Sequence, residues 1–177
     1  MRVYFFLVIG LAIMSSCSPK LTFYTEDLHN SLGFNEQELR QVQFYLSEEL
    51  VLERAADLDQ AEIREGRITL SRDRELERIR IPAKTQGAMV VSPDGKKLAI
   101  SFEDGSDSNY LIFGPVSNLR GQYMLRAREW RGRSAVVTYG GKTYTTGAGA
   151  HNVGLKVQLR ALEKQKVESR TVGGRKP

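Results

Sequence analysis

The chain has 177 residues, of which 41% are hydrophobic and 27% charged, and its formal net charge at pH 7 is +5. A single cysteine excludes an internal disulfide, so an apolar core must stabilise any folded domain. The positive excess is small and charges of both signs are mixed along the chain, which argues against a nucleic-acid-binding protein.

The first 16 residues have the pattern of an export signal. Arg2 gives a positive start, and the apolar run from Val3 to Met14 is 12 residues long. The small residues Ser15 and Ser16 follow it. A membrane-spanning helix needs about 20 apolar residues, so the pattern predicts a removable signal.

Cys17 follows these small residues directly. The segment that ends there resembles the type II signal peptide of bacterial lipoproteins, with Met14 three residues before the cysteine, where the family usually has leucine or another aliphatic residue. The resemblance covers residues 1–17 only. It implies cleavage before Cys17, a diacylglycerol on its thiol and often an acyl chain on its amine.

Lipidation would also account for the only thiol of an exported chain. Two or three acyl chains hold a protein firmly on a membrane, whereas one holds it only marginally. Ser18 stands where Asp would retain the best-studied Gram-negative lipoproteins in the inner membrane, so the expected address is the outer membrane. The alternative is an ordinary signal peptide with a cysteine near its end by chance.

The remaining chain is predicted to contain one domain. We expect a lipidated tether over residues 17–25, a β-rich domain over residues 26–170 and a flexible basic tail over residues 171–177. Removal of the signal would leave 161 residues with a formal net charge of +4. The eight residues after Cys17 span at most about 28 Å when extended, which would keep the domain near its membrane.

Two short helices are expected at the start of the domain. A helical turn over residues 26–32 would stop at Gly33. Asn35 and Glu38 have the spacing of a capping box, which predicts a helix from about Glu36 to Gln43.

The rest of the domain is predicted to consist of short strands. Pro93-Asp94-Gly95 is the best-defined turn, because proline presets φ and glycine accepts a positive φ. The expected strands are Phe44–Arg54, two around a Glu65-Gly66 turn, Leu76–Ile81, Gln86–Ser92, Lys97–Glu103, Tyr110–Phe113, Tyr123–Trp130, Ala135–Tyr139, Lys142–Thr146 and Val153–Ala161. Many short strands between turns predict a mainly β fold, an antiparallel sandwich or a small barrel.

Motifs for metal, phosphate or catalysis are weak. Asp104–Asn109 is rich in oxygen ligands, but the twelfth position from Asp104, where an EF-hand has its bidentate Glu, holds Pro115. Gly147–Asn152 precedes a strand pattern, whereas a phosphate cradle requires a helix there. His151 is the one histidine with a plausible functional place, and it lacks a triad motif. We therefore expect no metal, no cofactor and no catalytic residue.

Residues 126–133 combine the only tryptophan with four arginines. Arginine and tryptophan often carry most of the binding energy of an interface, so the segment is a candidate contact for an acidic partner or a sugar. The alternative is a hairpin in which the tryptophan packs at the edge of the core and an Arg-Gly-Arg turn follows it. The candidate contact residues are Arg126, Arg128, Trp130, Arg131, Arg133 and His151.

Together these patterns predict a membrane-anchored lipoprotein of the cell envelope. It would act as a non-enzymatic structural or accessory subunit of an envelope assembly, with other envelope proteins as partners and no nucleic acid. The alternative is a periplasmic or surface lipoprotein that binds a lipid or a saccharide. A hydrolase that uses His151 is a third possibility.

Overall fold

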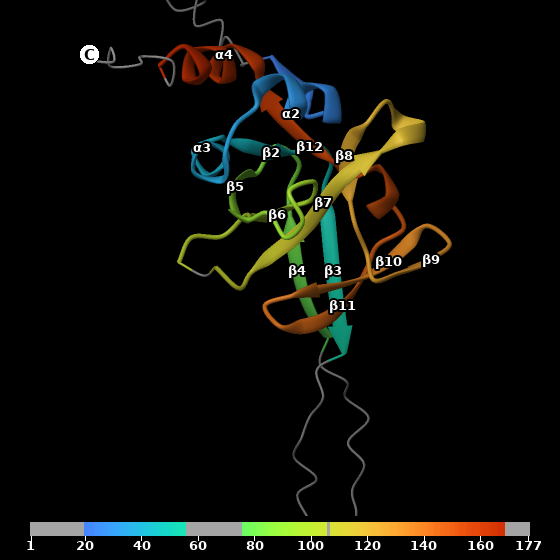
Figure 1. Cartoon of the computed structure of the whole chain (residues 1–177). Coiled ribbons are helices and arrows are strands. Elements are labelled where there is room, and N and C mark those ends of the chain that lie inside the picture. The colour runs from blue at the N-terminus through green and yellow to red at the C-terminus, as the bar shows by residue number, and fades with distance from the viewer. Residues whose placement is uncertain (1–19, 56–75, 106, 169–177) are drawn as a thin grey trace, which may run out of the picture.

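The computed structural model describes residues 20–55, 76–105 and 107–168. They form two antiparallel β-sheets that pack together, with helices at one end (Figure 1). The predicted fold class is confirmed in its sandwich form, because the strands divide into two sheets and do not close into a barrel. Cys17, the Glu65-Gly66 hairpin and the basic tail lie outside the described residues.

The larger sheet has seven strands. Their order is β1 (Leu21–Phe23), β12 (Leu155–Gln158), β2 (Phe44–Leu46), β5 (Gln86–Val91), β6 (Leu98–Ser101), β7 (Tyr110–Val116) and β8 (Gln122–Leu125). Isolated bridges join Thr25 to Gln122 and Met124 to Gly154. The edge strand β8 therefore also contacts the chain next to β1 and next to β12, at the other edge of the sheet. The sheet thus curls around its core.

The smaller sheet has five strands and is more open. Their order is β4 (Leu76–Ile81), β3 (Leu50–Ala55), β11 (Lys142–Thr146), β10 (Ser134–Tyr139) and β9 (Glu129–Arg131). Residues alternate between buried and exposed along β10, and the buried positions include Ala135 and Val137. One face of this sheet thus closes the core, and the strands β4 and β9 form its two edges.

The predicted strand Phe44–Arg54 is wrong as a single element, because it forms β2 and β3 in different sheets. The break falls at Ser47, which is buried although it is polar. Its Oγ accepts a hydrogen bond from the Gly154 backbone N–H at 2.8 Å and donates to the Asn152 carbonyl at 3.3 Å. The Ser47 hydroxyl thus satisfies backbone groups of Gly154 and Asn152 that have no strand partner at this point. The chain can therefore cross between the sheets inside the core without leaving these groups unpaired.

The predicted strand Tyr123–Trp130 is divided in the same way into β8 and β9. Two shorter corrections concern the strand ends. β7 does not stop before Gly114-Pro115 but runs to Val116, because beyond Phe113 it pairs only with β8 and leaves the proline on a free side. The last strand ends at Gln158 and not at Ala161.

Helix α4 (Leu159–Glu168) takes the place of the end of that strand. Leu162 is buried, and the Gln165 side chain donates to the Glu38 carbonyl at 2.8 Å. These two residues are three apart and lie on one helical face, so tertiary contacts overrode the period-two pattern.

The N-terminal helices are confirmed, with one shorter than predicted. Helix α2 (Glu26–Leu32) begins after Thr25 and ends at Gly33, whose φ is +62°. Helix α3 (Glu36–Arg40) has the complete capping box of Asn35 and Glu38. It ends at Arg40, before the predicted Gln43.

Part of the predicted tether belongs to the domain. Residues Leu21–Phe23 form β1, in which Leu21 pairs with Gln158, and Tyr24 is fully buried. The folded domain thus includes residues 21–24, which the prediction assigned to the tether.

The hairpin at Pro93-Asp94-Gly95 is confirmed, with Gly95 at φ +70°. Asp94 Oδ1 accepts from the backbone N–H groups of Lys96 and Lys97 at 3.0 and 2.7 Å. The charge-assisted hydrogen bonds from Lys97 and the backbone lower the Asp94 pKa to about 2. The turn is therefore fixed by its own side chain.

Candidate functional site

Trp130 lies in the middle of β9 with 43% of its surface exposed. It pairs with Ala135, so its ring is on the core-facing side of the sheet, and β9 is an edge strand of that sheet in the part of the chain that the structure describes. The hairpin expected at Gly132 is confirmed, with φ +62° at this glycine. The structure thus has the hairpin and the Arg-Gly-Arg turn of the alternative interpretation, with Trp130 on an edge strand and partly exposed.

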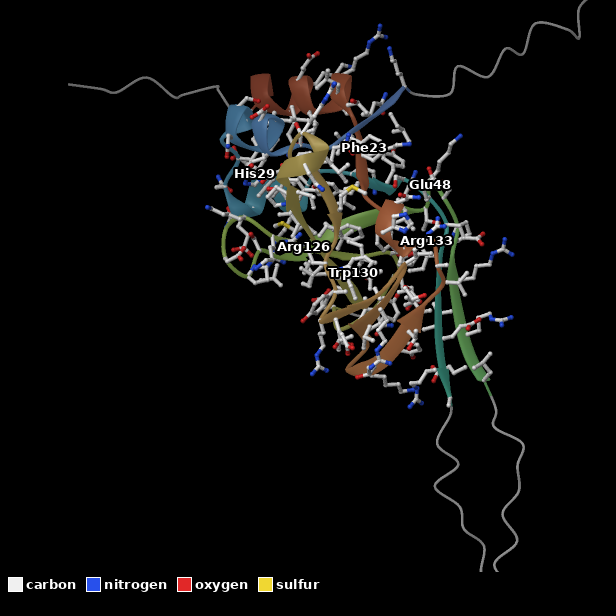
Figure 2. The ribbon with its side chains drawn as sticks, turned by 90° about the vertical axis from the view of Figure 1, so that its right-hand side faces the viewer. Phe23, His29, Glu48, Arg126, Trp130 and Arg133 are labelled. Atoms are coloured by element: carbon white, nitrogen blue, oxygen red, sulfur yellow. The ribbon has the colours of Figure 1, made fainter. Side chains whose placement is uncertain are left out.

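The arginines around Trp130 differ in their pairing. Arg131 binds the Glu129 carboxylate on the same strand with an Nε–Oε1 distance of 3.0 Å. Arg133 lies in the β9–β10 turn and, among the described residues, has no carboxylate partner. In Figure 2, Arg126, Trp130 and Arg133 follow one another across the side of the molecule that faces the viewer.

Arg126 and Arg128 lie where the chain passes from one sheet to the other. The Arg126 backbone N–H donates to the Ile112 carbonyl in β7 at 2.7 Å, and that of Arg128 donates to the Val136 carbonyl in β10 at 2.9 Å. Both side chains are exposed, and neither has a carboxylate partner within the described part of the chain. The backbone of this crossing is thus fixed at both ends, while its charges stay available.

A hollow of about 620 Å³ opens beside this crossing. We call it the inter-sheet hollow, and its walls are β7 on one side and the β10–β11 hairpin on the other. The side chains of Lys97, Arg126 and Arg128 contribute three cations to its lining, while Leu111 and Val137 are buried beneath it. Its volume is within the range of small-molecule sites.

His151 lies apart from any acid–base partner. It is exposed in the 3-10 turn η2 (Ala150–Asn152), which packs near β8 and β10. A loop was expected at Gly147–Asn152, and this single turn forms its second half. The structure thus gives His151 a surface position without a hydrogen bond to Ser, Asp or Glu among the described residues.

Sequence reasoning overlooked His29, which has a structural contact network. Its Nδ1 lies 2.8 Å from the Tyr24 hydroxyl, and its ring also contacts Tyr123 with centroids 5.8 Å apart. Burial lowers the His29 pKa, although the Gly95 backbone and the Glu26 carboxylate act in the opposite direction. Burial likewise raises the pKa of Tyr123 to about 12.

These rings fasten α2 to the core. The signal that could have revealed them is positional. Tyr24 precedes the N-cap Thr25 and His29 is the fourth helical residue, which are the two positions of a hydrophobic staple.

The described residues also bear on metal ions and membranes. No group of three or more His, Cys, Asp or Glu side chains in that part of the chain is placed to hold a metal ion. None of its helices is both long and apolar enough to cross a membrane.

The geometry therefore offers two neighbouring features with available positive charge, the exposed edge at β9 and the inter-sheet hollow. Comparisons of the chain with models of protein families, with curated proteins and with solved structures gave no match in any of the three.

Proposed function

We propose that this protein is a lipid-anchored envelope protein that acts as a non-enzymatic accessory subunit and binds an acidic protein partner at its β9 surface. We define the β9 surface by Arg128, Trp130 and Arg133. The observation that carries the proposal is the exposure of Trp130 on an open sheet edge between arginines that have no carboxylate partner among the described residues.

The chemistry of this surface is that of a protein contact. An edge strand presents backbone N–H and C=O groups that a second chain can pair with. Tryptophan and arginine are the side chains most enriched in binding hot spots, and an exposed indole gains most when a partner excludes water from it. Unpaired guanidinium groups favour a partner that supplies carboxylates.

The expected anchor fits the position of this surface. Leu21 pairs with Gln158, so the start of the described chain lies beside the first turn of α4. Cys17 is three positions before Lys20, which is a span of about 10 Å when extended. An anchor at Cys17 would therefore turn the helical end of the domain toward the membrane.

The β9 surface would then face away from the membrane. Figure 1 shows α2 and α4 at one end of the molecule and the hairpins of the five-stranded sheet toward the other. A partner in the envelope could thus reach Trp130 without passing the lipid head groups.

The test is site-specific photo-crosslinking in intact cell envelopes. A photoreactive amino acid replaces Trp130 in one variant and Thr143, an exposed residue on the opposite face of the same sheet, in the matched control. We expect a discrete protein adduct from position 130 and none from position 143. Equal adducts at both positions, or none at either, would contradict the proposed partner surface.

The anchor is tested separately with Cys17→Ala. The variant is expected to leave the membrane fraction and to lose labelled fatty acid, without any change in its thermal midpoint. Retained label would show that Cys17 is not the acylated residue. The alternative function, binding of a lipid or saccharide, draws support from the inter-sheet hollow.

A further inference from the structure

The inter-sheet hollow has both cationic and apolar side chains in its lining. Its lining comes from β7, from residues 126–128 and from the β10–β11 hairpin, so both sheets contribute to it. Sites of this size with an apolar floor and a few charged groups are typical of small-molecule binding.

The cationic end of the hollow depends on Gly114. A Cβ at this glycine would lie 3.2 Å from Lys97 Cγ and 3.5 Å from Arg126 Nε. Because the glycine has no side chain, the lysine and the arginine can both pass over the same point of β7. This close approach brings the Arg126 guanidinium near the backbone of β7 at the end of the hollow.

The charges at this end are not equally available. The Lys97 ammonium is held by the Asp94 carboxylate at 2.7 Å. Arg126 and Arg128 have no carboxylate partner among the described residues, and their backbones are fixed by hydrogen bonds to β7 and β10. Guanidinium groups on a fixed backbone suit bidentate binding of a carboxylate or phosphate.

Apolar side chains form much of the remaining lining of the hollow. Leu111 and Val137 are already buried beneath it, whereas Ile112 and Ala127 are only half-buried and still expose apolar surface. An anion without an apolar part would leave Ile112 and Ala127 in contact with water. A ligand with an aliphatic segment gains affinity when it removes this surface from water.

We propose that the inter-sheet hollow binds an anionic amphiphile. A carboxylate or phosphate head lies between Arg126 and Arg128, and an aliphatic segment covers Ile112 and Ala127. The site depends neither on an anchor at Cys17 nor on a partner at the β9 surface, so each of the three can fail without the others.

Calorimetric titration tests the proposal on the purified full chain carrying Cys17→Ala, so that no attached acyl chain competes. The probes are decanoate, decyl phosphate, decanol and inorganic phosphate, with the decyl compounds below their aggregation concentrations. We expect decanoate or decyl phosphate to bind at least about tenfold more tightly than decanol or inorganic phosphate. Decanol lacks the anionic head group, and inorganic phosphate lacks the aliphatic segment. The stronger of the two anionic probes identifies the head group.

The double variant Arg126→Ala, Arg128→Ala is expected to weaken binding of the anionic probe by about 10- to 100-fold. The matched control is Arg78→Ala, Arg80→Ala, which removes two arginines from β4 and is expected to leave affinity unchanged. Thr138→Asp is a second test, since it places a negative charge on an exposed lining position without altering the core. It should also weaken binding, even if the double variant does not fold.

Three results would overturn the site. They are that neither decanoate nor decyl phosphate binds more tightly than decanol, that neither binds more tightly than inorganic phosphate, or that Thr138→Asp leaves the affinity for the stronger probe unchanged.

Discussion

At one edge of the five-stranded sheet, β4 holds each of its arginines against a carboxylate; at the other edge, the arginines around β9 remain mostly unpaired. Arg78 lies 2.8 Å from Glu53, and Arg80 lies 2.6 Å from Glu49. Only Arg131 among the arginines of residues 126–133 has such a partner in the described chain.

The difference shows that an arginine on the surface can bind a partner only if a neighbouring carboxylate does not already hold it. Exposed ion pairs contribute little to stability, about 0 to 1 kcal/mol each, but they remove both partners from recognition. The β4 edge therefore presents neutralised pairs to the solvent. The β9 edge presents an indole and free guanidinium groups, which is why both proposed contacts lie on its side of the molecule.

The largest effect is expected from a core substitution, which tests whether the two edges of the sheet unfold together. Leu52 is fully buried in β3 and pairs with Ile79 of β4 and Thr146 of β11. Leu52→Ala is expected to lower the free energy of unfolding by about 2 to 5 kcal/mol in urea titrations. Leu76→Ala, at an exposed position of β4, should change it by less than about 0.5 kcal/mol.

Trp130 makes the same experiment a test of the β9 edge. It is the only tryptophan, so its fluorescence reports that edge while circular dichroism reports all strands. We expect both signals to change at the same urea concentration in Leu52→Ala. An earlier transition in one signal would show that the edges unfold independently.

A smaller effect is expected from the hydrogen bond that secures β4. The buried Tyr144 hydroxyl donates to Glu77 Oε1 at 2.9 Å. Tyr144→Phe should lower the free energy of unfolding by about 1.5 to 3 kcal/mol, because the lost bond is to a charged group. Tyr45→Phe is the matched control, since Tyr45 is half-buried and its hydroxyl has no hydrogen-bond partner within the described part of the chain. An equal loss of unfolding free energy in Tyr144→Phe and Tyr45→Phe would contradict a specific contribution of the Tyr144–Glu77 hydrogen bond.

The smallest effect separates the edges by their response to acid. Hydrogen bonds from Tyr144 and then Arg54 lower the Glu77 pKa below its ordinary 4.5, and Arg131 lowers the Glu129 pKa. A carboxyl whose pKa is lower in the folded state gives stability that is full above pH 4.5 and is lost as pH falls further. Urea midpoints measured from pH 6 to pH 2 should lose part of this acid slope in Glu77→Gln.

Glu129→Gln should change the acid slope much less. Its partner Arg131 is on the same exposed strand, and solvent screens the pair. A slope that Glu129→Gln flattens as strongly as Glu77→Gln would contradict the contrast between the edges.

Several elements could be predicted because their signals are local. The Asn35–Glu38 capping box and the Pro93-Asp94-Gly95 turn each satisfy their own backbone within a few residues. The candidate arginines were also found, since their density with the single tryptophan is visible in the chain. The inter-sheet hollow could not be found, because its walls come from β7, β10 and the segment between β8 and β9.

What the sequence by itself determined is the mainly β pattern, its local caps and turns, and the expectation of an anchored envelope protein. Only the tertiary structure decided where the chain crosses between sheets, because Ser47 is stabilised by Gly154 and Asn152, more than 100 residues away. It also decided which arginines remain available, since ion pairing across β3 and β4 depends on strand register and not on composition.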